Sequence, residues 1–297
     1  METALAIPYR HENIGQYIPT QAENDAQVVN LWLHGKSPRT QREYRRDLAS
    51  FDASTGGRPL RWVVLADLQG FLDSMAHLAP RTQARRLAAV KSLLSFSQKI
   101  GYVAFNVGAA VKGPKVRNDL SERILDEEAV LRMIALEPNA RNRALLKLLY
   151  GGGLRASEAV GLRWLDFAET SDNQAVVTVF GKGGRTRHVL IPAGVWREVK
   201  ALRRPEDGQD APVFCSRKGG AISYSQAWRI VRAAADRART GKPVSPHWLR
   251  HACASHAMDR GCPIHVVQET LGHASMGMTG RYLHVRPGES AGRYLAV

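Results

Sequence analysis

The sequence contains few cysteines, no long apolar run and fewer acids than bases. The three cysteines, Cys215, Cys253 and Cys262, form no Cys-x-x-Cys pair and no even set, which argues against a disulfide framework and for reduced thiols. No apolar run approaches the roughly 20 residues that cross a bilayer. The stretch "METALAIPYRHEN" lacks the pattern of a signal peptide. We therefore expect a cytoplasmic protein without a membrane segment.

The shortage of acidic residues extends along the whole chain. Lys and Arg number 42 against 27 Asp and Glu, which gives a net charge of +15. Residues 1–118 hold 16 bases and 9 acids, and residues 119–297 hold 26 and 18. Because both halves are basic, the pattern favours one polyanion that both contact, and nucleic acid is the natural candidate. A basic protein without such a partner is the alternative.

The length of 297 residues and the apolar pattern predict two domains. Residues 1–21 form a lead-in segment, and residues 22–112 show the three- and four-residue apolar spacing of helices. A linker is expected at 113–121, where Gly-Pro and mixed charges interrupt the pattern. Residues 122–285 mix helices with short strands, and 286–297 form a tail. The predicted fold is mostly α with a small antiparallel β-sheet, as a helical domain followed by an α+β domain.

Two predicted helices of the first domain begin with nearly the same letters. "SPRTQREYRRDLASF" and "APRTQARRLAAVKSLLSF" each place a proline at the first helical turn, followed by Arg-Thr-Gln and a basic face. Backbone N–H groups at such a helix start, with a hydroxyl and arginines beside them, suit phosphate groups. Ordinary caps beside solvated basic faces are the alternative. The candidate DNA-binding residues are Arg39, Thr40, Arg81, Thr82 and Arg85.

The second domain contains a predicted β-hairpin that carries a lysine. "AVVTVF" and "RHVLI" are strand-like, and "GKGGRT" between them is a glycine-rich turn. Lys182 at this tip is able to swing into a groove, and a solvated lysine is the alternative. Arg185 and Arg187, which follow it, are further candidate DNA-binding residues. Asp126, followed by two acids, is expected to begin a helix before the hairpin.

Three further stretches carry candidate residues. In "LYGGGLRASEAV", three glycines precede Arg155, and Glu158 one turn later is placed to orient that arginine or to be a solvated acid. In "SPHWLRHACASHAM", Ser245 is a helix cap, and His247 and Arg250 lie near the positive helix end, which suits an anion. In "LGHASMGMTGRYLHV", His273 precedes a tyrosine by nine residues, although a Gly-His pair is often only a turn.

His247 and His251 have the four-residue spacing of a helical zinc pair. The glutamate of a His-Glu-x-x-His motif is absent, and the cationic Arg250 between the two histidines opposes metal binding. We therefore expect no metal and no other cofactor, with a zinc hydrolase as the rival interpretation.

In order along the chain, these stretches resemble the boxes of the tyrosine recombinase (phage integrase) family. "GLRASE" is similar to its first arginine box, "HWLRH" to its His-x-x-Arg-His box, "LGH" with a tyrosine nine residues later to its nucleophile box, and "GKGGRTRHVLIP" to its lysine hairpin. The resemblance is strong over about 120–285 and looser over 22–110. The catalytic set that it implies is Arg155, Lys182, His247, Arg250, His273 and Tyr282.

The resemblance implies a helical core-binding (SAM-like) domain followed by a catalytic domain, as in the two-domain Xer-like members. It implies site-specific recombination through a 3′-phosphotyrosyl intermediate on double-stranded DNA. The active form would be a homo-tetramer on two DNA duplexes, a monomer or weak oligomer when not bound, with the tail docking on a neighbouring protomer. Gly-Arg-Tyr-Leu occurs twice, and the spacing from His273 favours Tyr282 over Tyr294 as nucleophile.

Three other functions compete with this interpretation. A type IB topoisomerase-like enzyme would use similar chemistry, but the two-domain layout favours a recombinase. A catalytically silent DNA-binding architectural protein would have no need for Lys182 and Tyr282 together. The zinc hydrolase is the third. The sequence does not distinguish phage integration, dimer resolution and transposon movement, and it does not reveal the target site.

Overall fold

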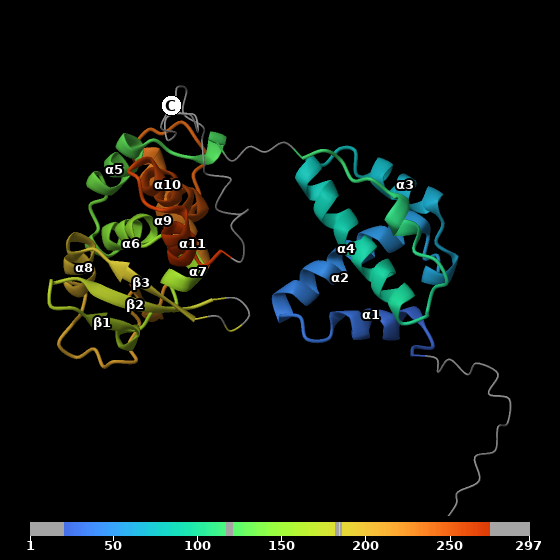
Figure 1. Ribbon diagram of the computed structural model, residues 1–297, viewed down its shortest axis with the longest axis horizontal. Coiled ribbons are helices and arrows are strands. Elements are labelled where there is room, and N and C mark those ends of the chain that lie inside the picture. Colours follow the sequence, from blue (N-terminus) through green and yellow to red (C-terminus); the bar gives the residue numbers. More distant parts are fainter. Residues whose placement is uncertain (1–20, 117–120, 182–183, 185, 274–297) are drawn as a thin grey trace, which may run out of the picture. The chain divides into compact units, whose positions relative to one another are not determined.

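The computed structural model describes residues 21–116, 121–181, 184 and 186–273, and it divides into two compact units. The first unit spans Met1–Arg117 and the second Asn118–Val297. Figure 1 shows the helical first unit and the mixed second unit with its small sheet. The predicted fold class is therefore confirmed. No helix among the described residues is long and apolar enough to span a membrane.

The first unit consists of helices and short turns of 3₁₀ helix. The helices are α1 (Asp25–Leu33), α2 (Pro38–Thr55), α3 (Leu65–Ser74) and α4 (Pro80–Lys99), with η1 (Leu60–Trp62) and η2 (Val107–Ala110) between and after them. Their apolar faces meet in one core that includes Trp32, Phe51, Phe71, Leu87 and Val90. Prolines at the first helical turn begin both α2 and α4, as the sequence predicts.

The second unit begins with helices that pack around a buried α6. η3 (Ser121–Arg123) precedes α5 (Glu127–Ala135), α6 (Ala140–Gly151), α7 (Ala156–Ala159) and η4 (Trp164–Asp166). Asp126 accepts a hydrogen bond from the backbone N–H of Ala129 at 2.6 Å and so begins α5, as predicted. The later helices are α8 (Ala193–Lys200), α9 (Tyr224–Arg237), α10 (Pro246–Asp259) and α11 (Ile264–Leu271).

A three-stranded antiparallel sheet lies against these helices in the order β1 (Phe167–Glu169), β2 (Ala175–Phe180), β3 (Thr186–Ile191). Alternate residues of β2, Ala175, Val177 and Val179, are buried in the core that α6, α9 and α10 share. Phe180 pairs with Thr186, the last pair before residues 181–185, which connect β2 to β3. The sheet therefore has one apolar face.

A second pair of strands, β4 (Cys215–Ser216) and β5 (Gly219–Ala221), forms a short hairpin. The sequence does not predict these strands or β1, because each has at most three residues and β5 contains two glycines.

Candidate active site

The three glycines before Arg155 form a tight passage from α6 into α7. Gly153 has a φ of +59°, and a Cβ at this position would lie 2.7 Å from Leu271 Cδ2 and 3.2 Å from Cys253 Sγ. Only glycine fits both that backbone conformation and that space. The passage brings the carbonyl of Gly153 and the start of α7, where Arg155 lies, beside α10 and the end of α11.

Glu158 holds Arg155 at the start of α7. Glu158 Oε2 accepts from the backbone N–H of Arg155 at 2.8 Å, and Oε1 accepts from Arg155 Nη1 at 2.7 Å. The Arg155 side chain is about one-third exposed and that of Glu158 is buried. Although burial raises the pKa of Glu158, hydrogen bonds from Arg187 and Arg155 lower that pKa to about 2. Glu158 is therefore an ionised buried carboxylate that fixes an arginine.

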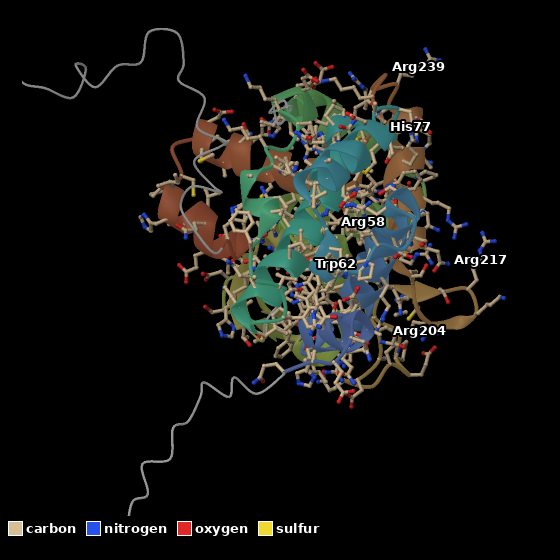
Figure 2. All side chains as sticks on the ribbon, turned by 90° about the vertical axis from the view of Figure 1, so that its right-hand side faces the viewer. Arg58, Trp62, His77, Arg204, Arg217 and Arg239 are labelled. Atoms are coloured by element: carbon tan, nitrogen blue, oxygen red, sulfur yellow. The ribbon has the colours of Figure 1, made fainter. Side chains whose placement is uncertain are left out.

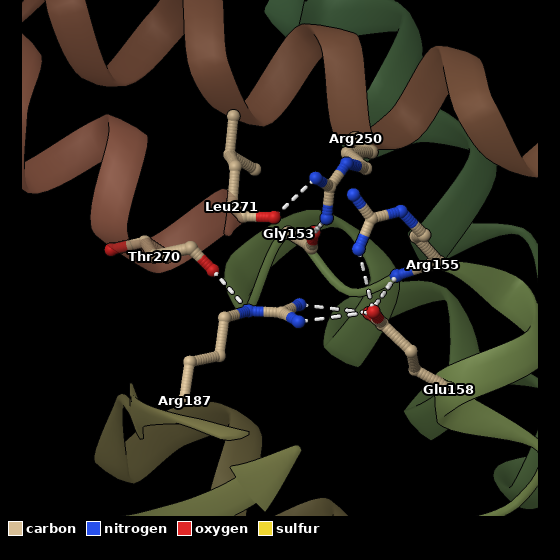
Figure 3. Close-up of polar contacts among 7 residues, drawn as sticks. All are labelled: Gly153, Arg155, Glu158, Arg187, Arg250, Thr270 and Leu271. Carbon is tan, nitrogen blue, oxygen red and sulfur yellow. Dashed lines mark hydrogen bonds and ion pairs between the residues drawn. The ribbon is translucent and has the colours of Figure 1, made fainter. Parts of the chain in front are cut away.

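Helix α10 places Arg250 deep in the unit. Arg250 is 3% exposed. Its Nη1 donates to the carbonyl oxygen of Gly153 at 2.6 Å and its Nη2 donates to that of Leu271. These contacts fix a positive charge where the glycine passage meets the end of α11. Figure 3 shows both contacts beside Arg155 and Glu158, whereas Figure 2 shows arginines such as Arg217 and Arg239 extending from the surface.

His247 lies in the first turn of α10, and His273 follows α11. Burial and the positive charges of Arg250 and Arg155 lower the pKa of His247. Burial, followed by the charges of Arg250, Arg155 and Arg187, lowers the pKa of His273 to about 4. In both cases the lowered pKa favours the neutral imidazole at physiological pH. The predicted helix start at Ser245 is correct, but the Ser245 side chain makes no capping hydrogen bond.

His251, the other half of the suggested zinc pair, lies one turn after His247. The two rings are 6.4 Å apart, centre to centre. Burial and the charges of His247 and Arg250 lower the pKa of His251 to about 4. Across residues 21–116, 121–181 and 186–273, no group of three or more metal-binding side chains gathers to hold an ion. The geometry does not add a third ligand to this pair.

Arg187, expected to contact DNA, lies within the protein. Its two terminal nitrogens donate to Glu158 and its Nε donates to the carbonyl oxygen of Thr270. Lys182, Arg185, Tyr282 and Tyr294 lie outside the described residues. The described part of the predicted set that the fold gathers is Arg155, Glu158, Arg187, His247, Arg250 and His273.

The two similar helix starts of the first unit differ in their hydrogen bonds. At α2, Ser37 Oγ accepts from the Thr40 N–H at 3.2 Å and pairs with its hydroxyl at 2.9 Å. At α4, Ala79 offers no side-chain cap, and the Thr82 N–H donates to the Ala79 carbonyl at 2.8 Å. Arg39 and Arg81 are exposed beside these two starts.

Arg85 pairs with Asp47, a residue that the sequence does not single out. Asp47 is fully buried. Arg85 Nη2 donates to Asp47 Oδ1 at 2.9 Å, and Arg85 Nη1 donates to Oδ2. An acid inside a basic helix is ordinarily solvated, so no local signal marks Asp47.

Family models and known relatives match most of the chain. Residues 123–289 match the model of the "Phage integrase family", and residues 29–99 match that of the "Phage integrase, N-terminal SAM-like domain". The chain is 32% identical to tyrosine recombinase XerD of Corynebacterium glutamicum over 288 residues, covering 87% of this chain and 93% of that protein. It is 34% identical to tyrosine recombinase XerC of Xanthomonas campestris pv. campestris (strain B100) over 259 residues, covering 84% and 79%.

Two solved structures share the fold. The Tn1549 transposon integrase (residues 82–397) in complex with circular intermediate DNA superposes with a TM-score of 0.74 at 18% identity, covering 92% of this chain and 99% of that one. The XerH recombinase in a post-cleavage complex with difH substrate gives a TM-score of 0.69 at 22% identity, covering 89% and 82%. The family models and the curated relatives together show that the chain belongs to the phage integrase family and is a tyrosine recombinase.

Proposed function

We propose that the protein cleaves and rejoins double-stranded DNA at a specific site through a covalent bond to Tyr282. The observation that carries this proposal is the convergence of Arg155, Arg250, His247 and His273 in the second unit. Fixed positive charge and hydrogen-bond donors are what a phosphodiester transition state requires, because it gathers negative charge on its non-bridging oxygens. Arg155 and Arg250 are already held by Glu158 and by two carbonyls, so little reorganisation is needed.

The roles of the remaining residues follow from the chemistry. The Tyr282 hydroxyl attacks phosphorus, and the two arginines bind the non-bridging oxygens. His247 and His273, whose lowered pKa values favour the neutral imidazole, donate hydrogen bonds or accept the tyrosine proton. Lys182 donates a proton to the departing 5′ oxygen. The product is a 3′-phosphotyrosyl bond and a 5′ hydroxyl, and a second 5′ hydroxyl reverses the step. The phosphotyrosyl bond retains the energy of the phosphodiester, so no cofactor is required.

DNA binding involves both units in this proposal. Each half of the chain is basic, with exposed arginines at the starts of α2 and α4 in the first unit. Two similar folds, the Tn1549 integrase and XerH, were solved with DNA bound. We assign phosphate contacts to Arg39, Thr40, Arg81 and Thr82, with Arg185 near the lysine. Arg85 belongs with them through the part of its side chain that Asp47 leaves exposed.

The proposed active form is a homo-tetramer on two DNA duplexes in the cytoplasm, with the tail at 286–297 docking on a neighbouring protomer. Deletion of 286–297 tests the tail. Synapsis of two duplexes is expected to weaken more than binding to one site, and an equal loss of both would contradict the assignment.

Covalent trapping tests the proposed function. The substrate is a nicked duplex that carries the element's own attachment site, and wild type is compared with Tyr282→Phe and Tyr294→Phe. Wild type and Tyr294→Phe are expected to form the adduct, and Tyr282→Phe to bind DNA without forming it. Site binding without any adduct by wild type would favour the rival function, a catalytically silent architectural protein.

A further inference from the structure

Arg187 is a strand residue whose charged group points into the protein. Its side chain is 10% exposed. Nη1 and Nη2 donate to Glu158 Oε1 and Oε2 at 3.0 and 2.8 Å, and Nε donates to the Thr270 carbonyl oxygen at 2.9 Å. All three guanidinium nitrogens thus have protein acceptors, and the contact with Glu158 is bidentate. A side chain used in this way is poorly placed to meet a DNA phosphate.

The acceptors of Arg187 belong to two segments that carry other site residues. Glu158 also receives the backbone N–H and the Nη1 of Arg155, so one carboxylate lies between two arginines (Figure 3). Thr270 lies three residues before His273, in the last turn of α11. Arg187 therefore connects strand β3 to Arg155 on one side and to the turn that carries His273 on the other.

The packing at this junction leaves little freedom. Gly272, between Thr270 and His273, has a φ of +63°, and a Cβ there would lie 2.9 Å from Arg187 Cδ. The turn into His273 thus passes directly over the Arg187 side chain. Arg187 is the second residue of strand β3, so the start of this strand and the turn share one anchor.

We propose that Arg187 is a positioning residue that sets the places of Arg155 and His273 and the base of the lysine hairpin. It acts through Glu158 and the Thr270 carbonyl and does not itself touch DNA. The inference rests on the proposed function, since Arg155 and His273 act in catalysis only if the protein cleaves DNA. A lysine cannot replace this arginine. A single ammonium group cannot make the bidentate contact with Glu158 and, at the same time, donate to the Thr270 carbonyl oxygen in the opposite direction.

The test compares Arg187→Lys with wild type on the nicked attachment-site duplex. The expected result is a single-turnover cleavage rate lower by about 10- to 100-fold at saturating DNA, the order that a misplacement of about 1 Å costs. The dissociation constant and its salt dependence are expected to stay within about twofold. Arg217→Lys, at the exposed β4–β5 turn, is the matched control and is expected to keep the wild-type rate.

A phosphate contact would give the opposite pattern. Binding would weaken, the slope of log affinity against log salt would fall by about one, and the saturated rate would not change. That pattern, or an unchanged rate with unchanged binding, would overturn the proposal.

A pH profile separates positioning from loss of fold. Without the hydrogen bonds from Arg187, the pKa of Glu158 is expected to rise, so Arg187→Gln should lose cleavage activity at a higher pH than wild type does as the solution is acidified. The double variant Arg187→Gln/Glu158→Gln should lack this acidic limb, whatever its maximal rate. An identical pH profile in both variants would contradict the proposed link through Glu158.

Amide hydrogen exchange tests the inference without cleavage. In the protein alone, Arg187→Lys is expected to speed exchange at Leu271–His273 by at least about tenfold, with little change in α9. If wild type forms no adduct, the proposed function fails, and unchanged exchange at 271–273 would independently refute the role of Arg187.

Discussion

Each unit of this protein contains a cluster in which a buried carboxylate pairs with two arginines. The two clusters connect different kinds of segment. In the first unit, Asp47 of α2 pairs with Arg85 and Arg86, neighbours on α4. In the second, Glu158 pairs with Arg155 at the start of α7 and Arg187 on β3. The first arrangement fixes the crossing of two long helices. The second gathers residues from separate segments around one point.

Exposure separates Arg85 from Arg187 and Arg250, whereas Arg86 and Arg155 are similarly exposed, at 25% and 32%. The Arg85 side chain is 46% exposed, whereas that of Arg187 is 10% exposed and Arg250 is almost fully buried. Half-exposed arginines can both pair with an acid and reach a phosphate. Arg187, whose three guanidinium nitrogens all have protein acceptors, holds other groups in place. The net charges of the two halves are similar, so pairing and burial, and not the number of basic residues, distinguish the arginines proposed to bind DNA from those proposed to position the site.

The largest expected effect is that of Arg250→Lys, which would break the catalytic side of this comparison. A lysine keeps the positive charge but cannot bridge the carbonyls of Gly153 and Leu271, so the charge is no longer fixed in place. We expect the single-turnover cleavage rate to fall by about 10²- to 10³-fold, as on loss of one transition-state donor. Arg86→Lys in the first unit is the counterpart, with an expected change below about threefold. If Arg250→Lys lowered the cleavage rate as little as Arg86→Lys does, the proposed difference between the arginines of the two units would be contradicted.

Asp47→Ala is next, because it leaves Arg85 and Arg86 beside an apolar core. Since Arg85 is partly exposed to water, we expect a loss of about 1–3 kcal/mol in the stability of the first unit. Hydrogen exchange of the α2 and α4 amides in the full chain measures it. Asp73→Ala on the exposed side of α3 should cost no more than about 0.5 kcal/mol. Equal costs would mean that burial of Asp47 is unimportant.

Glu158→Gln sharpens the comparison through pH. The pKa of Glu158 is about 2 in the folded protein against an ordinary value of about 4.5, so its contribution to stability is present above pH 4.5 and is lost as the pH falls towards 2. Between pH 4.5 and 3, wild type is expected to lose about 1 kcal/mol per pH unit more than the glutamine variant. Urea unfolding at several pH values measures this difference. Parallel curves would show that Glu158 is not the responsible group.

The smallest effect is expected for the exposed arginines of the first unit. Arg39→Ala and Arg81→Ala should each weaken DNA binding modestly and lower the salt slope by about 0.9, the share of one phosphate contact. The cleavage rate at saturating DNA should not change. Titrations at several salt concentrations give the slope, and a lower saturated rate with an unchanged slope would contradict the assignment of these residues to binding.

In the second unit, the sequence predicts the positions of the candidate site residues better than the contacts that hold these residues in place. Arg155, Glu158, His247 and Arg250 lie at helix starts whose signals are local: a glycine run, a cap position and a first-turn proline. The sequence suggests a DNA contact for Arg187. Its hydrogen-bond partners in the structure, Glu158 and Thr270, lie 29 and 83 positions away, and nothing near Arg187 in the sequence indicates them. The carbonyls of Gly153 and Leu271 carry no residue-type signal at all.

In the first unit the same limit applies. Helices and their first turns follow from apolar spacing and proline, but Asp47 and Arg85 are 38 residues apart and look like two ordinary surface charges. Two helix starts with nearly identical letters also differ in hydrogen bonding, since Ser37 caps one and Ala79 cannot cap the other. Contacts between residues far apart in the sequence, and not local helix propensity, determine the features that the sequence does not predict.

The most direct test of the account is to find which residue carries DNA after cleavage. The trapped adduct is digested after arginine residues and analysed by mass spectrometry. Cleavage after Arg281 and Arg293 separates the peptide that contains Tyr282 from the terminal peptide that begins at Tyr294. The account predicts the nucleotide on the Tyr282 peptide alone. A nucleotide on the Tyr294 peptide, or on neither, would contradict it.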